Sequence, residues 1–217
     1  MSFSKWEGYN LGIGQALAMG VPVIGSDIEA HREFPIFTTN DVRVAMDKLC
    51  ETFEATRNGA EATRISLSDF PLPIYDGDLQ AKSGIPKHAI NLKRMMGAHQ
   101  GVLIVTPEYN SSVPALVKNT IDWISRVQDP QETRGQVFRD RAFAIAAASG
   151  NRLGGTRALQ ALRLILTACH ATVVPNQLAL SFAEEAYDDN DRLKHPHDIE
   201  AMGALVRQLI EFSQRMM

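Results

Sequence analysis

The chain has 217 residues, 45% of them apolar, and a formal net charge of −3. This length provides enough apolar surface for one large α/β domain, and the near-balance of charges gives no electrostatic footprint for nucleic acid or for a membrane surface. No apolar run approaches the roughly 20 residues that a transmembrane helix needs, so we expect a soluble cytoplasmic protein.

Two cysteines, Cys50 and Cys169, have no spacing typical of a metal site, and a chain of this size predicts no disulfide framework. We expect both to be reduced, partly buried thiols.

Short apolar runs alternate with segments of helical period, which is the pattern of a parallel α/β sheet. The predicted strands are Val21–Ile24, Ala62–Leu67, Val102–Val105, Ala142–Ala148 and Thr172–Val174, the last continuing toward Leu180. The third and fourth strands are continuously apolar, which indicates that helices cover both their faces and that they lie at the sheet centre.

Six helices are predicted between and around these strands: Asn10–Met19, Asp41–Arg57, Pro86–His99, Val113–Arg126, Gly155–His170 and His197–Met216. Five strands separated by helices predict one doubly wound, flavodoxin-like domain over residues 1–217, with strand order 2-1-3-4-5 and an extra N-terminal helix. Two long loops, 69–85 and 183–198, are expected to be functional or mobile.

Ligands of such sheets bind beyond the carboxyl ends of the strands. Three loops are predicted to converge there: the one from Gly25 onward, Thr106–Ser112, and Ser149–Gly155. The third loop contains three glycines and precedes a helix, so its N–H groups favour an electron-rich or anionic ligand. Glycine-rich turns that bind nothing have the same spacing, and this alternative stays open on the pattern alone.

Four motifs occur in order from about Gly59 to the C-terminus: Ser68–Asp78 (SDFPLPIYDGD), Thr106–Ser112 (TPEYNSS), Val117–Trp123 (VKNTIDW) and Ala148–Gly155 (ASGNRLGG). With these motifs the chain resembles the NAD(P)H-dependent FMN reductase family, flavodoxin-like enzymes that include quinone, azo-dye and metal-ion reductases. The resemblance implies FMN as cofactor, NADPH or NADH as co-substrate, a small-molecule electron acceptor and a homodimer or homotetramer. Trp123 is expected at the subunit interface.

The resemblance also implies the residues of a flavin site. Those expected to border the isoalloxazine ring are Pro107, Glu108, Tyr109 and Asn110, and those expected at its pyrimidine edge are Ser149, Gly150, Gly154 and Gly155. Their chemistry agrees, because an aromatic edge, an amide and backbone donors suit a ring whose reduced form carries negative charge. Hydride passes directly between the two cofactors, so no catalytic acid or base and no metal ligand is predicted.

The phosphate loop departs from the family pattern of Gly-Ser-x-Arg followed by Ser-x-Asn. Gly25 and Ser26 are present, and Thr39 and Asn40 offer hydroxyl and amide donors at the next predicted helix start. Asp27 and the nearby Glu29 and Glu33 bring negative charge, which repels a phosphate.

Residues 1–55 instead resemble the C-terminal donor-domain segment of a retaining two-domain glycosyltransferase, through Ser4–Asp27 and Ala30–Phe34. The acceptor-binding domain and most of the donor domain of such an enzyme are missing from this chain. We therefore interpret the chain as a chimera in which this segment supplies the first strand and first crossover helix.

Three functions follow as alternatives. The first is an FMN-dependent NAD(P)H oxidoreductase of the FMN and quinone reductase type. The second is a flavodoxin-like scaffold with weak or no flavin binding and no activity. The third and most remote is a fragment that binds a nucleotide sugar near Glu7. Arg152 and Arg157 are candidates for contacts to the NADPH phosphate or to a flavin edge. His195 and His197 are interpreted as part of a solvated loop rather than as metal ligands.

Overall fold

The computed structural model describes residues 60, 62–190 and 192–216. In chain order its elements are η2 (Leu67–Asp69), α3 (Gly77–Ser83), α4 (Lys87–Gly97), β1 (Gly101–Thr106), α5 (Ala115–Ile124), α6 (Gln136–Arg139), β2 (Ala142–Ala148), α7 (Thr156–Ala168), β3 (Thr172–Leu180) and α8 (Pro196–Arg215). The predicted elements Asn10–Met19, Val21–Ile24 and Asp41–Arg57 lie outside these residues.

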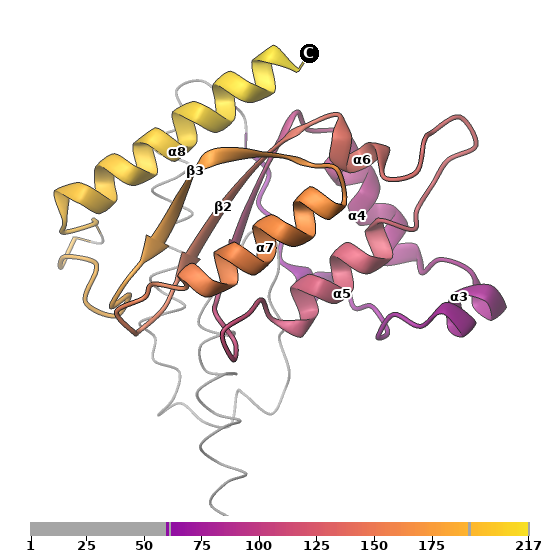
Figure 1. The fold of residues 1–217 in the computed structure, drawn as a ribbon, viewed down its shortest axis with the longest axis horizontal. Helices are drawn as coiled ribbons and strands as arrows, with labels where there is room; N and C mark the ends of the chain where they lie inside the picture. The colour runs from indigo at the N-terminus through magenta and orange to yellow at the C-terminus, as the bar shows by residue number, and fades with distance from the viewer. Residues whose placement is uncertain (1–59, 61, 191, 217) are drawn as a thin grey trace, which may run out of the picture.

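The described strands form a parallel sheet in the order β1-β2-β3 (Figure 1). Every residue of β2 is buried, which confirms the central position predicted from its continuous apolar sequence. Alternate β2 side chains serve opposite faces: Ala144 and Ala146 join one core cluster, whereas Phe143 and Ile145 join the other. The small alanines allow a helix to pack close to the sheet.

Helices cover both faces of this sheet (Figure 1). On one face, α8 packs its buried Met202, Leu205 and Val206 against the strands. On the other face, Val117 of α5 and Leu159 and Leu162 of α7 close a second cluster. The described part is therefore a three-layer α/β unit, as predicted for a doubly wound fold.

The helix boundaries follow the sequence signals closely. Pro86 and Pro114 occupy the N-cap positions of α4 and α5, one position before the first turn in which each proline was expected. Pro196 lies in the first turn of α8. Gly155 precedes α7 in a left-handed conformation.

β3 carries an irregularity at Pro175. Phe143 of β2 aligns with Val173, but Ile145 aligns with Gln177, so β3 contains extra residues. The Arg163 guanidinium donates to the carbonyl oxygens of Val174 at 2.9 Å and Pro175 at 3.3 Å, which satisfies backbone acceptors that leave the ladder. β3 is an edge strand of the described sheet. Its bulge and its proline therefore hinder pairing with a further strand.

Two predictions for residues 62–85 are wrong. Residues 62–66 form no strand, and the chain then enters the 3-10 turn η2, in which Asp69 N–H donates to the Ser66 carbonyl at 3.2 Å. A strand needs a neighbour for its backbone groups, and within the described residues β1 pairs only with β2. The predicted 69–85 loop contains helix α3, which Asp76 caps by accepting from the N–H groups of Asp78 and Leu79.

Trp123 is buried in its own chain rather than at a subunit interface. It has no exposed surface, and its indole Nε1 donates to the Pro73 carbonyl at 2.7 Å. Asn119 donates to the same carbonyl at 3.0 Å and accepts from Tyr75 N–H at 2.7 Å. These two α5 side chains thus hold the 73–75 segment against α5, and the interface prediction for Trp123 is wrong.

Candidate functional site

Two of the three predicted crevice loops leave the same edge of the sheet. Thr106, the last residue of β1, aligns with Ala147 of β2, so the loops that begin at Pro107 and Ser149 are neighbours. The third loop begins at Gly25, outside the described residues.

The first loop is a tight turn. Tyr109 N–H donates to the Ser112 carbonyl and Ser112 N–H donates to the Tyr109 carbonyl, both at 2.9 Å. Asn110 and Ser111 between them have φ of 47° and 64°, the left-handed values that type I′ turns require at both central residues. The turn exposes Asn110 and Ser111 at its tip while Pro107 is buried at its base.

The second loop needs its last two glycines for packing. Gly154 and Gly155 have φ of 58° and 86°. A Cβ on Gly154 would lie 2.7 Å from the Ala179 carbonyl oxygen, and one on Gly155 would lie 2.6 Å from the Ala147 Cβ. Both positions therefore exclude larger residues, whatever ligand the loop holds.

Internal hydrogen bonds shape the rest of this loop. Buried Ser149 donates its N–H to the Leu180 carbonyl at 3.0 Å, and the Asn151 side chain accepts from Leu153 N–H at 2.8 Å. The N–H groups of Gly150 and Arg152 donate to no acceptor within the described residues. The loop is thus fixed in shape by its own hydrogen bonds.

Glu108 joins the first loop to the first turn of α7, which directly follows the second loop. Its side chain is 3% exposed, and Arg157 pairs with it in a salt bridge. Glu108 Oε1 accepts from Arg157 Nε at 2.8 Å and from Arg157 Nη2, while Oε2 accepts from the backbone N–H of Arg157 at 3.1 Å and of Ala158 at 3.4 Å. The buried carboxylate is therefore satisfied by α7.

The model of the NADPH-dependent FMN reductase family matches residues 42–185, which include both loops. The chain belongs to this family. The match begins upstream of Gly59, so it includes much of the predicted helix Asp41–Arg57.

Curated relatives agree with membership of the FMN reductase family. The chain is 39% identical over 109 residues to a quinone reductase of Escherichia coli, an alignment that covers 50% of this chain and 54% of that protein. It is 36% identical over 132 residues to an NAD(P)H-dependent FMN reductase of Pseudomonas aeruginosa, covering 59% and 67%. The alignments thus span about half to two thirds of these relatives' lengths.

Solved structures share the fold. FerB, a flavoenzyme NAD(P)H:(acceptor) oxidoreductase from Paracoccus denitrificans, superposes with a TM-score of 0.62 at 21% identity, over 89% of this chain and 96% of that one. The apo form of the NADH:FMN oxidoreductase EMOB gives 0.54 at 16% identity, over 86% and 87%. These likenesses show an α/β flavodoxin-like fold. The glycosyltransferase resemblance of residues 1–55 finds no support in the family match or in these relatives, and most of that segment precedes the match.

This FMN reductase family member brings eight predicted site residues to one edge of the sheet: Pro107, Glu108, Tyr109, Asn110, Ser149, Gly150, Gly154 and Gly155. The other four, Gly25, Ser26, Thr39 and Asn40, lie outside the described residues. Sequence reasoning missed the pairing of Glu108 with Arg157, for which a separation of 49 residues gives no local signal.

In the 183–198 loop of this family member, Asp188 is engaged locally. Asp188 Oδ1 accepts from the N–H groups of Arg192 and Asn190, both at 2.9 Å, and these backbone donors, chiefly that of Arg192, hold the pKa of Asp188 below its ordinary value. Nearby, Ala186 and Leu193 are buried in the core. The loop is folded onto the sheet, and within the described residues no cluster of three or more potential ligands forms a metal site.

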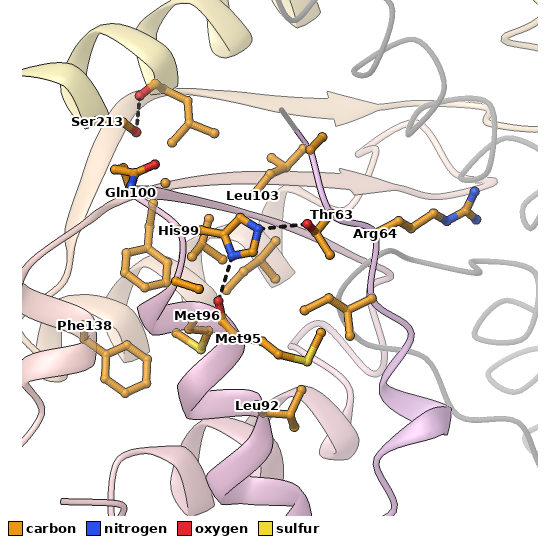
Figure 2. A pocket seen from close by; sticks show the side chains of 18 of the residues that line it. Thr63, Arg64, Leu92, Met95, Met96, His99, Gln100, Leu103, Phe138 and Ser213 are labelled. Atoms are coloured by element: carbon orange, nitrogen blue, oxygen red, sulfur yellow. Dashed lines mark hydrogen bonds between the residues drawn. The ribbon is translucent and has the colours of Figure 1, made fainter. Parts of the chain in front are cut away.

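A cavity of about 610 Å³ lies at the opposite end of β1 (Figure 2). Leu92, Met95 and Met96 of α4 and Phe138 contribute to its mainly apolar lining. His99 beside it hydrogen-bonds through Nδ1 with the Met95 carbonyl at 2.7 Å and through Nε2 with Thr63 Oγ1 at 2.9 Å. Because its lining includes Gly101 rather than Thr106, this cavity lies away from the loops that begin at Pro107 and Ser149.

Proposed function

We propose that the protein is an FMN-dependent NAD(P)H oxidoreductase that uses NADPH or NADH to reduce a small-molecule acceptor such as a quinone or free flavin. Bound FMN would supply the chemistry, accepting hydride from the nicotinamide and passing electrons to the acceptor. The observation that carries this proposal is the pair of loops at the carboxyl ends of adjacent parallel strands β1 and β2, both within the family match.

The residues of these loops fit a flavin. Half-buried Tyr109 offers an aromatic surface, and exposed Asn110 carries both a donor and an acceptor. The N–H groups of Gly150 and Arg152, which donate to nothing else in the described part of the chain, suit the polar edge of the ring. In this proposal these groups orient the ring and stabilise negative charge on it, and no side chain transfers a proton.

We propose that Gly25, Ser26, Thr39 and Asn40 hold the FMN phosphate. This requires Val21–Ile24 as a strand of the same domain, next to β1 as in the order 2-1-3-4-5, although residues 62–66 do not form the second strand of that five-stranded order. Asp27 would weaken phosphate binding through charge repulsion.

We also propose a cytoplasmic homodimer or homotetramer. The support is the family resemblance. Among the described residues, moreover, no helix combines the length and apolar composition needed to span a membrane.

FMN titration tests the function directly. We expect quenching of free FMN fluorescence, the absorption bands of a bound oxidised flavin after gel filtration, and oxidation of NADPH or NADH that depends on an added quinone. Protein that leaves FMN fluorescence unchanged and elutes colourless would contradict the proposal and favour the inactive scaffold.

A further inference from the structure

The helix that follows the glycine-rich loop cannot cap itself. Gly155 occupies the N-cap position of α7 and has no side chain to accept from the first-turn N–H groups. A larger residue is excluded there, because a Cβ would lie 2.6 Å from the Ala147 Cβ. The close packing of the loop on β2 therefore requires that the cap come from elsewhere.

Glu108 supplies that cap from the neighbouring loop. Its Oε2 accepts from the N–H groups of Arg157 and Ala158 in the first turn of α7, and its Oε1 accepts from Arg157 Nε. A carboxylate is favoured at this end of a helix by the helix dipole. The Arg157 guanidinium neutralises a charge that would otherwise be costly at 3% exposure.

The same contacts connect the first loop to the residues that directly follow the second loop. Glu108 is adjacent to Tyr109 at the start of the tight turn, and its partners lie two and three residues beyond Gly155. A shift of Glu108 relative to the first turn of α7 would break hydrogen bonds to a buried carboxylate. The pair therefore acts as a strut between the loops.

We propose that Glu108 and Arg157 are positioning residues that set the spacing of the flavin-binding loops, and that neither side chain is a ligand of the flavin. This inference rests on the proposed function. It reassigns Glu108, expected from the resemblance to border the ring, and Arg157, a candidate for cofactor contacts.

Coupling between the two residues distinguishes a strut from two independent contacts. FMN dissociation constants are measured by fluorescence quenching for the full chain and for Glu108→Gln, Arg157→Gln and the double variant. Glu108→Gln would place an amide donor against N–H donors, and Arg157→Gln would remove the bidentate partner, so we expect each single change to raise Kd about tenfold. The double variant should raise it no further than the worse single variant, because both changes break the same strut.

The visible circular dichroism of FMN-saturated protein reports ring orientation separately from stability. Glu108→Gln and Arg157→Gln should alter this spectrum in the same way, at temperatures well below each unfolding midpoint. Arg157→Gln stays informative if the Glu108 variant does not fold, because the Arg157 side chain is 45% exposed. Lys118→Gln, at an exposed pair with Asp122 on α5, is the control and should change neither readout.

Two results would overturn the strut: single-variant effects on Kd that multiply in the double variant, or an Arg157→Gln protein with wild-type Kd and dichroism. Absence of FMN binding by the wild-type chain is a different outcome. It refutes the proposed function itself, and the strut with it.

Discussion

Single residues at this site are constrained by backbone geometry as much as by ligand chemistry. Gly154 and Gly155 were predicted as flavin contacts, yet each is required by its left-handed φ and by atoms of β2 or β3 less than 3 Å from a hypothetical Cβ. Asn110 adopts a left-handed conformation that asparagine tolerates better than most residues. Glycine-rich loops of this kind are therefore determined partly by packing.

Substitution of Gly155 measures that constraint. Gly155→Ala should lower the free energy of unfolding by about 2–4 kcal/mol, through backbone strain and overpacking against Ala147. Gly77→Ala is the matched control, because no atom lies within 4 Å of its added Cβ and the effect should stay within about 0.5 kcal/mol. Chemical denaturation gives both values, and equal effects would contradict the packing argument.

At the scale of elements, charged side chains fix segments that have little core of their own. Lys93 of α4 is buried and donates to Asp129 at 2.6 Å and to Glu132 at 2.5 Å. Asp129 N–H also donates to the Glu132 carboxylate at 3.1 Å. This ion cluster holds the connection between α5 and α6 against α4.

The pH dependence of this cluster follows from its pKa shifts. Burial lowers the pKa of Lys93, but its bonds to Asp129 and Glu132 raise it by more, to above its ordinary value of 10.5. The hydrogen bond from Lys93 is the main cause that lowers the pKa of Asp129 below 3.8 and of Glu132 below 4.5. The stabilisation is thus complete between about pH 5 and 10, and is lost as acid protonates the carboxylates or as alkali deprotonates the lysine.

Lys93→Met should therefore lower the free energy of unfolding near pH 7. The difference in unfolding free energy from wild type should shrink as the pH falls below about 4. Lys118→Met, which removes an exposed i,i+4 pair with Asp122, should cost only about 0.3–0.5 kcal/mol. Urea denaturation across pH 3–8 checks this, and a deficit independent of pH would argue against an ionic contribution.

At the scale of the whole molecule, the described sheet has β2 at its centre with helices on both faces, and the family match extends upstream to residue 42. The proposed single domain requires a further strand from Val21–Ile24. Pro22 has no N–H to donate, so this segment would pair less completely than β2.

Hydrogen exchange tests that arrangement. If Val23 and Ile24 belong to the central sheet, their amides should exchange as slowly as those of Phe143 and Ile145, near the limit set by global unfolding. Exchange within seconds, with slow exchange retained at β2, would contradict a single domain whose sheet includes this segment.

The sequence by itself determined the elements whose signals are local. Continuous apolar runs predicted β1 and β2, and a shorter apolar run predicted the start of β3. Helical period predicted α4, α5, α7 and α8 to within three residues at each end, with prolines near the starts of α4 and α5. The two loops at the sheet edge were also predicted, because parallel topology places the ends of adjacent strands together.

Only the tertiary structure decided the rest. It showed that residues 62–66 form no strand, that Trp123 is buried against the Pro73 carbonyl, and that Glu108 caps a helix 49 residues later in the chain. The physical reason is common to all three. Strand pairing, burial and capping by distant groups depend on which residues lie nearby in space. Hydrophobic period and turn residues are local features of the sequence and do not identify those neighbours.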